Sequence, residues 1–377
     1  MLVNKTYKYR IYPNKDQIVL LLKHFGATRF VWNYFLDLRK ISYLENKKSL
    51  NFYDNSKQLT LLKQNKNFKW LNEVNSQALQ ATLKDLDTAY GRFFKKQSMF
   101  PKFKAKYKHI DSFRCPQNIK TQHKKLFIPK FTEGIQIIID REITGRMLFV
   151  TISKTSTNKF FAAITCEAEH IPLQSTTNKV GIDLGIKNLA VCSNGEKFSN
   201  PKIINKYAKQ LAYEQKQLAK KQKGSGKRLK QKKKVAIVYE TIKNIRKDNL
   251  HKITHSIIKQ NNIIVVENLN IQGMIKNHYL AKAISDVSWC MFTKQLEYKS
   301  QWNERNFVKI DRWFPSSKTC NNCNFINQNL KLQDREWICP KCNIILDRDL
   351  NAAKNILNQG LKILSDSEIK SDIKENT

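Results

Sequence analysis

The sequence predicts a mixed α+β protein of several domains, and three observations lead to this fold class. The chain of 377 residues is longer than one hydrophobic core ordinarily fills. Its apolar residues recur at helical spacing over 16–47 and 75–96, and then alternate over 100–171. Two close cysteine pairs follow towards the C-terminal end, in a pattern typical of a small metal-binding domain.

The N-terminal part begins with an alternating strand over 3–12, which the Pro-Asn pair at 13–14 ends. Helices are expected from 16 to about 47 and over 75–96. Their aromatic side chains predict a hydrophobic core, with base stacking as the alternative.

Residues 100–171 change to a period of two, which predicts a small barrel or sheet that the first strand completes. The expected strands cover 125–129, 134–139, 147–152 and 159–164. Basic side chains precede them and favour contact with phosphate over a merely solvated face: Lys102, Lys104, Lys106, Lys108 and Arg114.

A polar linker over 174–178 separates a new domain, in which strands meet single carboxylates. The strand at 180–185 is apolar except for Asp183, and 189–195 is its expected hairpin partner. The strand at 263–266 runs directly into Glu267. A lone carboxylate in an apolar strand is costly unless it is paired or bound to metal.

A long helical pattern over 202–260 is interrupted by a Gly-Ser-Gly segment at 224–226. The segment is either a helical hairpin with a basic tip or a basic flexible loop, and its expected use is contact with a phosphate backbone. The flanking basic residues are Lys216, Lys220, Lys221, Lys223, Lys227, Arg228, Lys230, Lys232, Lys233 and Lys234.

The cysteine pairs are Cys320 with Cys323 and Cys339 with Cys342, separated by fifteen residues. Such pairs can place four thiolates around one Zn²⁺ ion in a zinc ribbon, whereas the alternative is a coincidental pair of turns. The other four cysteines are scattered, which favours metal binding in a reducing compartment over disulfides.

The formal charge of +37, from 68 basic and 31 acidic residues, predicts a polyanionic partner. Nucleic acid is the first candidate and a membrane surface is the alternative. No apolar run approaches the roughly 20 residues of a spanning helix, and the N-terminus lacks a signal-peptide core. A cytoplasmic protein is therefore expected.

Three carboxylates lie at the margins of apolar elements: Asp183, Glu267 and Asp349, the last at the start of a helix expected over 350–362. If they converge, they can hold two divalent cations that activate a water and stabilise the leaving oxygen of a phosphodiester. Oxygen ligands favour Mg²⁺ or Mn²⁺. The residues alone leave open the alternative of ordinary polar strand ends and a helix N-cap.

Four segments occur in the order typical of one family: 181–190, 265–270, 315–320 and 347–353, with support from 101–104, 112–114 and 277–289. In these segments the chain resembles the TnpB (OrfB-type) proteins of insertion sequences. The resemblance covers nearly the whole chain. It implies an RNA-guided DNA endonuclease related to type V CRISPR effectors.

The resemblance also implies a domain order. An N-terminal wedge β-barrel over 1–12 and 97–173 is interrupted by a helical recognition insert over 13–96. A RuvC-like nuclease of the RNase H fold follows over 177–313 and 346–362, with a zinc ribbon inserted over 314–345. A disordered tail is expected over 363–377.

Site residues are implied in the same way. Asp183, Glu267 and Asp349 match the catalytic Mg²⁺ ligands, with Asp347 as a second choice, and the cysteine pairs match structural zinc ligands. Two departures stand beside them: Asn268 occupies a position where the family commonly has Asp, and Leu346 one where it often has His. No acidic ligand is missing, which argues against a regulator that has lost cleavage.

The expected function is cleavage of double-stranded DNA. The protein would bind a guide RNA from its own mobile element, pair the guide with one strand beside a short flanking motif and cut both strands at one site. A guided repressor without cleavage and a transposase acting on element ends are the alternatives. No Tyr or Ser stands in a recognisable strand-transfer motif.

Overall fold

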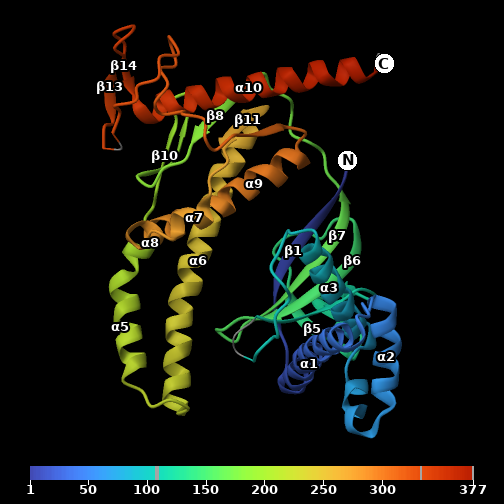
Figure 1. The fold of residues 1–377 in the computed structure, drawn as a ribbon. Coiled ribbons are helices and arrows are strands. Elements are labelled where there is room, and N and C mark those ends of the chain that lie inside the picture. Colours follow the sequence, from blue (N-terminus) through green and yellow to red (C-terminus); the bar gives the residue numbers. More distant parts are fainter. Residues whose placement is uncertain (107–109, 332, 376–377) are drawn as a thin grey trace. The chain divides into compact units, whose positions relative to one another are not determined.

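The computed structural model describes residues 1–106, 110–331 and 333–375, and it divides into two compact units (Figure 1). The first unit covers 2–170, and the second covers 171–377 together with Met1. Both contain helices and sheets around cores of their own. The prediction of a mixed α/β chain with more than one domain is therefore confirmed.

The first unit is built on a sheet of seven antiparallel strands in the order β2-β6-β7-β1-β5-β4-β3. Its middle strand, β1 (Leu2–Tyr12), pairs with β7 along most of its length and with β5 at its end. Because side chains alternate across a strand, Tyr9 and Ile11 share the buried face. The other strands are β2 (Asp111–Cys115), β3 (Lys120–Gln122), β4 (Lys125–Ile128), β5 (Phe131–Ile138), β6 (Arg146–Lys154) and β7 (Phe160–Glu169).

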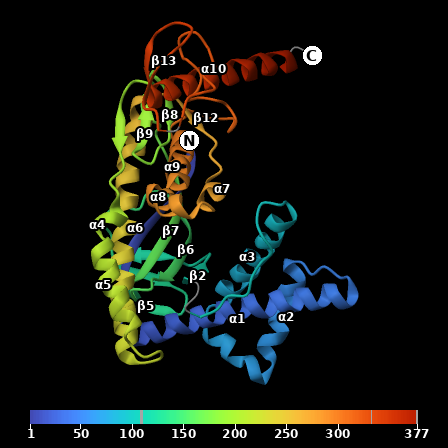
Figure 2. The same ribbon diagram turned by 60° about the vertical axis from the view of Figure 1, so that its left-hand side comes forward.

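Helices occupy the sequence between β1 and β2: α1 (Lys15–Asn46), α2 (Phe52–Gln64), η1 (Lys66–Glu73) and α3 (Ser76–Phe94). Figure 2 shows them gathered together, and Phe35, Leu79 and Leu83 pack into their common core. Asn14 caps α1 with a reciprocal hydrogen-bond pair to Gln17. Helical spacing in the sequence predicts α1 and α3 but not α2 and η1, although Asn51 and Asp54 form a second capping box.

The second unit has a five-stranded sheet in the order β10-β9-β8-β11-β12. β8 and β12 run parallel to β11, whereas β9 is antiparallel to β8 and to β10. The strands are β8 (Lys179–Asp183), β9 (Asn188–Cys192), β10 (Lys197–Ser199), β11 (Ile263–Glu267) and β12 (Asn306–Ile310).

Both faces of this sheet are covered by helices. Ile264 and Val266 pack with residues of α6 (Gly226–Gln260) and α9 (Trp289–Trp302). The intervening Val265 joins Ile356 of α10 (Arg348–Glu375) on the other face. The alternation explains why the strand is apolar throughout, because every side chain meets a helix.

The basic segment around 224–226 is a helical hairpin, which resolves the two alternatives left by the sequence. α5 (Ala208–Ala219) and α6 lie side by side (Figure 1). Arg228 donates to the carbonyl oxygens of Leu218 and Lys221 at 2.8 and 2.7 Å, and Ser225 caps α6. These bonds fix the turn between the helices.

Short elements complete the second unit: α4 (Ile203–Lys206), α7 (Ile271–Ile275), α8 (His278–Val287), β13 (Glu336–Ile338) and β14 (Ile345–Asp347). α10 continues to Glu375, whereas the sequence pattern predicts a helix end near 362 and a disordered tail from 363. Polar composition favours a tail but does not forbid helical backbone, because Lys, Glu and Ile all have moderate or good helix propensity.

Candidate functional site

Asp183 and Glu267 end two neighbouring strands at the same edge of the second sheet. β8 and β11 are parallel, with Ile182 opposite Val266, so the next residue of each strand is one of the two acids. Asp349 lies in the first turn of α10, which packs on β8. The three acids thus lie on adjoining elements, although Asp183 and Glu267 are 84 positions apart in the sequence and Glu267 and Asp349 are 82 apart.

The electrostatics of Asp183 show that the three acids share one environment. Burial, followed by the nearby carboxylates of Glu267 and Asp349, raises the pKa of Asp183 to about 8, against a smaller opposing effect of Arg348. Burial also raises the pKa of Glu267, although a hydrogen bond from Ser316 opposes the shift. Crowded carboxylates disfavour ionisation, and a bound cation relieves this cost.

The acids are more widely spaced than the cysteines. Among the described residues, only the four cysteines bring three or more ligand atoms within 4.8 Å of one another. Asp349 lies 3.6 Å from an Arg335 guanidinium nitrogen, and its side chain is 25% exposed. The three acids therefore lie near one another without forming a closed cage.

Asp347, the second choice from the sequence, has a different role. Its carboxylate accepts the backbone N–H of Leu350 at 2.9 Å, as a helix N-cap does, and accepts from Lys197 at 2.8 Å. Burial alone would raise the pKa of Asp347, but these hydrogen bonds and the Lys197 charge outweigh it and hold the pKa below its usual value. The N-cap considered for Asp349 is thus supplied by Asp347.

Ser316 is a site residue that the sequence analysis does not single out. Its hydroxyl donates a hydrogen bond to the Glu267 carboxylate. The residue is 6% exposed and lies just before the first cysteine pair. The only signal in the sequence is its place in the segment 315–320 that supports the family resemblance.

The four cysteines form two matching turns. In each, the backbone N–H after the second cysteine donates to the carbonyl oxygen of the first, and that residue, Asn324 or Asn343, has a φ of +59°. The Sγ atoms of Cys320 and Cys342 are 3.7 Å apart, and those of Cys323 and Cys339 are 3.5 Å apart. Tetrahedral Zn–S bonds of about 2.3 Å require sulfur separations of about 3.8 Å, so the donor set fits a structural zinc ion.

Leu346 packs beneath this cluster with Trp337 and Leu330. A leucine at this position therefore contributes to the small core of the ribbon. The Leu346 side chain is 8% exposed.

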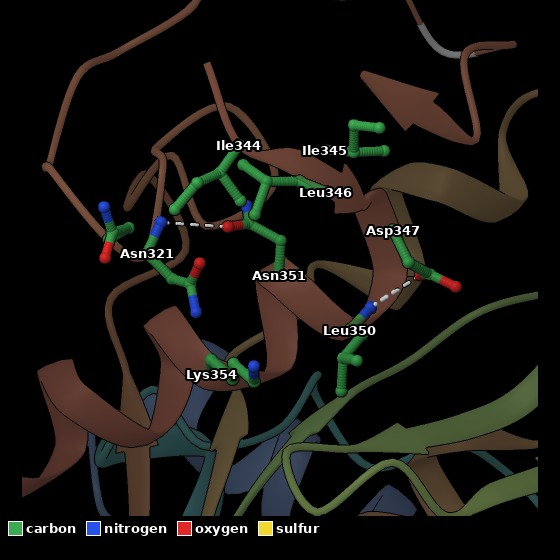
Figure 3. A pocket seen from close by; sticks show the side chains of 9 residues that line it. Asn321, Ile344, Ile345, Leu346, Asp347, Leu350, Asn351 and Lys354 are labelled. Atoms are coloured by element: carbon green, nitrogen blue, oxygen red, sulfur yellow. Dashed lines mark hydrogen bonds between the residues drawn. The ribbon is translucent and has the colours of Figure 1, made fainter. Parts of the chain in front are cut away.

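A pocket of about 280 Å³ lies between the cysteine turns and the first turns of α10 (Figure 3). Asn321 and Asn351 meet on one side of it through a hydrogen bond, and Asp347 bonds Leu350 on the other. The hydrogen bond between Asn321 and Asn351 joins the first cysteine turn to the helix that carries Asp349.

The hairpin of α5 and α6 carries a concentration of basic side chains. No acidic residue occurs between Glu214 and Glu240. Eight lysines there are exposed: Lys216, Lys220, Lys223, Lys227, Lys230, Lys232, Lys233 and Lys234. Such a surface can bind a phosphate backbone.

The basic run before the sheet of the first unit is partly structural. Lys104 places its ammonium 3.7 Å from the ring centroid of Trp32, and Arg114 donates to Asp85 at 2.6 Å. Each of these two side chains therefore has a partner within the protein, and phosphate contact by the basic run stays a prediction. Lys108 lies outside the described residues.

No helix in the described part of the chain is both long and apolar enough to cross a membrane.

Three family models match the chain. One described as a probable transposase of the OrfB type covers 163–278, which includes Asp183 and Glu267. A Cas12f1-like TNB domain covers 289–356, which includes the four cysteines and Asp349. A helix-turn-helix model covers 1–48, where the structure contains β1 and the single helix α1.

Full-length relatives match over nearly the whole chain. A Streptomyces pristinaespiralis protein is 37% identical over 95% of this chain and 90% of its own length. An Escherichia coli K12 protein is 30% identical over 97% and 94%. The names of both give RNA-guided DNA endonuclease as the inferred activity. A TnpB-like protein of Acanthamoeba polyphaga mimivirus is 23% identical over 94% and 73%.

A solved structure shares the fold. A chain in a cryo-EM structure of a Cas12f1–sgRNA–target DNA complex matches with a TM-score of 0.57 and 15% identity, over 95% of this chain and 99% of that one.

Proposed function

The chain belongs to the TnpB (OrfB-type) family of RNA-guided DNA endonucleases of insertion sequences, and from this premise we propose that it cuts double-stranded DNA at the acidic site. Its guide is an RNA from the same mobile element, paired with one target strand beside a short flanking motif. The single observation that supports cleavage is the meeting of Asp183, Glu267 and Asp349 on adjoining elements.

The two units take the roles expected from the family. The strands of 1–12 and 97–173 serve as the wedge, and the helices of 13–96 serve as the recognition insert. Residues 177–313 and 346–362 form the RuvC-like nuclease, and 314–345 form the zinc ribbon. The mixed sheet with helices on both faces supports the nuclease assignment.

Asp183, Glu267 and Asp349 would hold two divalent cations. Carboxylate oxygens suit Mg²⁺ or Mn²⁺. Burial first, and the neighbouring carboxylates second, raise the pKa of Asp183, and a bound cation would favour its ionised form. When bound, such ions supply an activated water and stabilise the leaving oxygen. The protein orients the ligands: β8 and β11 present two acids side by side, and Ser316 holds the Glu267 carboxylate.

Cys320, Cys323, Cys339 and Cys342 would hold one structural zinc ion. Four thiolates would complete a tetrahedral coordination sphere and leave no open position for a substrate. The ribbon core is small, with Leu330, Trp337 and Leu346 as its buried apolar residues. A domain of this size needs the metal for stability.

The test is cleavage of a plasmid library with a randomised flank, in the presence of guide RNA and Mg²⁺. Single replacements Asp183→Ala, Glu267→Ala and Asp349→Ala should each reduce cleavage below about one hundredth of the wild-type rate. Guide RNA affinity should remain at the wild-type value, because the acids do not contribute positive charge. Asp248→Ala, which removes an exposed carboxylate of α6, is the matched control.

Two outcomes would contradict the proposal. Guide-bound wild-type protein that binds target DNA without cutting it would identify a guided repressor. Nucleic-acid-free protein that cuts DNA without any guide would remove the guided function.

A further inference from the structure

Two buried asparagines lie one helical turn apart on α10, close to the acidic site. Asn351 is 2% exposed and Asn355 is 4% exposed, and at this spacing both face the same side of the helix. A buried amide is costly unless its polar atoms are hydrogen-bonded. Their partners therefore show what this face of the helix is built to hold.

Both side chains bond the backbone around Cys320. Asn351 donates to the carbonyl oxygen of Thr319 at 2.7 Å and accepts the backbone N–H of Asn321 at 2.9 Å (Figure 3). Asn355 donates to the carbonyl oxygens of Ser316 and Thr319 at 2.8 and 2.6 Å. Backbone N–H groups only donate and carbonyls only accept, so the orientation of the Asn351 amide follows from its partners.

The same contacts reach the acids. Ser316 accepts from Asn355 through its carbonyl and donates through its hydroxyl to Glu267. Asp349 precedes Asn351 by two residues on the first turns of α10. One continuous set of hydrogen bonds thus joins the first cysteine turn, the start of α10 and the end of β11.

Close packing fixes the remaining acid relative to the same helix. A methyl group at Gly181, two residues before Asp183, would lie 2.2 Å from the carbonyl oxygen of Ala353. α10 therefore sits directly against the backbone of β8. A shift of α10 would change the distances from Asp349 to both other acids.

We propose that Asn351 and Asn355 are positioning residues that tie the zinc-binding turn at Cys320 to the helix carrying Asp349, with Ser316 extending the tie to Glu267. This inference rests on the proposed nuclease function. The ordered cysteine turn sets where α10 begins and how Glu267 is held. The ribbon is in this way a support of the acidic site as well as a separate small domain.

Hydrogen–deuterium exchange of the guide-bound complex tests the tie directly. The Asn321 amide is bonded to the Asn351 side chain, so Asn351→Ala should speed its exchange by about tenfold or more. Asn358→Ala, which changes an exposed asparagine of the same helix, should leave it unchanged. An unchanged exchange rate of the Asn321 amide in the Asn351→Ala protein would overturn the proposal.

The metal dependence of cleavage tests the consequence for the acids. In Asn355→Ala, the Mg²⁺ concentration for half-maximal cleavage should rise by about tenfold or more, as is typical when a support of a metal ligand is lost. Excess Mg²⁺ should restore part of the rate, and half-saturation by target DNA should not change. A purely structural defect would lower the fraction of active protein at an unchanged Mg²⁺ requirement, and that result would overturn the proposal.

A cysteine variant tests the link to the ribbon. Cys323→Ser should lose zinc, measured by elemental mass spectrometry, and should show the same faster exchange at 319–321 and the same higher Mg²⁺ requirement. Asn355→Ala should retain zinc. A zinc-free Cys323→Ser protein with the wild-type exchange rate and the wild-type Mg²⁺ requirement would contradict the link. A wild-type complex that never cuts DNA would contradict only the nuclease function, and the exchange result would still test the tie.

Discussion

At the scale of single residues, environment separates side chains of the same type. Asp183, Asp347 and Asp349 are all carboxylates in or beside apolar elements. Asp347 is held by Lys197 and by the backbone N–H of Leu350, whereas Asp183 faces Glu267 and Asp349. The first arrangement stabilises a helix start. The second combines burial with carboxylate repulsion, and a bound cation can offset both.

The raised pKa of Asp183 predicts a pH-dependent stability. The folded protein binds the proton more tightly than the unfolded chain, so the free energy of unfolding in Mg²⁺-free buffer should fall as pH rises from about 4 through about 8. Between about pH 6 and about pH 8 we expect a loss of about 1–3 kcal/mol, which Asp183→Asn should remove. Denaturant titrations at several pH values measure the free energy of unfolding. The same dependence of this free energy on pH in the wild-type and Asp183→Asn proteins would contradict the prediction.

Replacement of Asp347 should affect stability rather than chemistry. Asp347→Ala removes the N-cap of α10 and should cost about 0.5–2 kcal/mol of unfolding free energy. Asp347→Asn keeps a capping oxygen and should cost less. Thermal unfolding together with cleavage at a permissive temperature distinguishes this role from that of a metal ligand, since loss of cleavage in a fully folded Asp347→Asn protein would assign Asp347 to the site.

At the scale of elements, the packing of α10 on the sheet decides where Asp349 lies. The helix approaches β8 at Gly181 and β11 at Gly360, where an added methyl would lie 2.4 Å from Val265. Neither glycine has a positive φ, so close approach rather than backbone conformation requires them. Small residues in both elements let the backbones come together.

Gly181→Ala should therefore displace α10 and destabilise the second unit. The new methyl would meet backbone atoms of Ala353 and Leu357, which cannot rotate away, and a cost of about 1–3 kcal/mol is expected. Gly91→Ala is the control, because nothing lies within 4 Å of a methyl at this exposed helical position and a gain of about 0.5–1 kcal/mol is expected. Denaturant unfolding measures both, and a neutral Gly181→Ala would show that the helix has room to move.

At the scale of the whole molecule, the charge of +37 is distributed unevenly along the chain. The α5–α6 hairpin concentrates lysines without acidic neighbours, whereas Lys252 on the same helix is paired with Asp248 at 2.7 Å. A lysine that binds a phosphate displaces a counterion from the nucleic acid. A lysine that is already paired with a carboxylate is expected to displace fewer.

A triple replacement of Lys227, Lys230 and Lys234 by Gln should weaken guide RNA binding and make the affinity less dependent on salt concentration. The slope of log K against log salt concentration should become less steep by about 2, since each phosphate contact contributes about 0.7–0.9. Lys252→Gln should change the slope little. Binding titrations over a range of salt concentrations measure the slopes, and an unchanged slope in the triple variant would remove the hairpin from the RNA-binding surface.

Local sequence pattern is enough to predict several elements of this protein. Period-two and helical spacing predict β1, α1 and α3, a continuous apolar run predicts β11, and the two cysteine pairs predict the four-thiol cluster. Each of these signals is contained in a short stretch of the chain. Short or weakly patterned elements are missed, including β2, β3, β10, α2 and α8. Their stability comes from packing against distant elements, which a local pattern does not contain.

The arrangement of the acids and of the groups that hold them depends on long-range packing. Apolar pattern alone does not distinguish Asp347 from Asp349, and the family resemblance only ranks Asp349 first. The structure separates them, because Lys197, 150 positions away, donates a hydrogen bond to Asp347. The hydrogen bonds from Asn351 and Asn355 to the turn at Cys320, and from Ser316 to Glu267, also join residues 30 to 49 positions apart. Such contacts follow from how β8, β11 and α10 pack, and packing brings together side chains that sequence neighbours cannot specify.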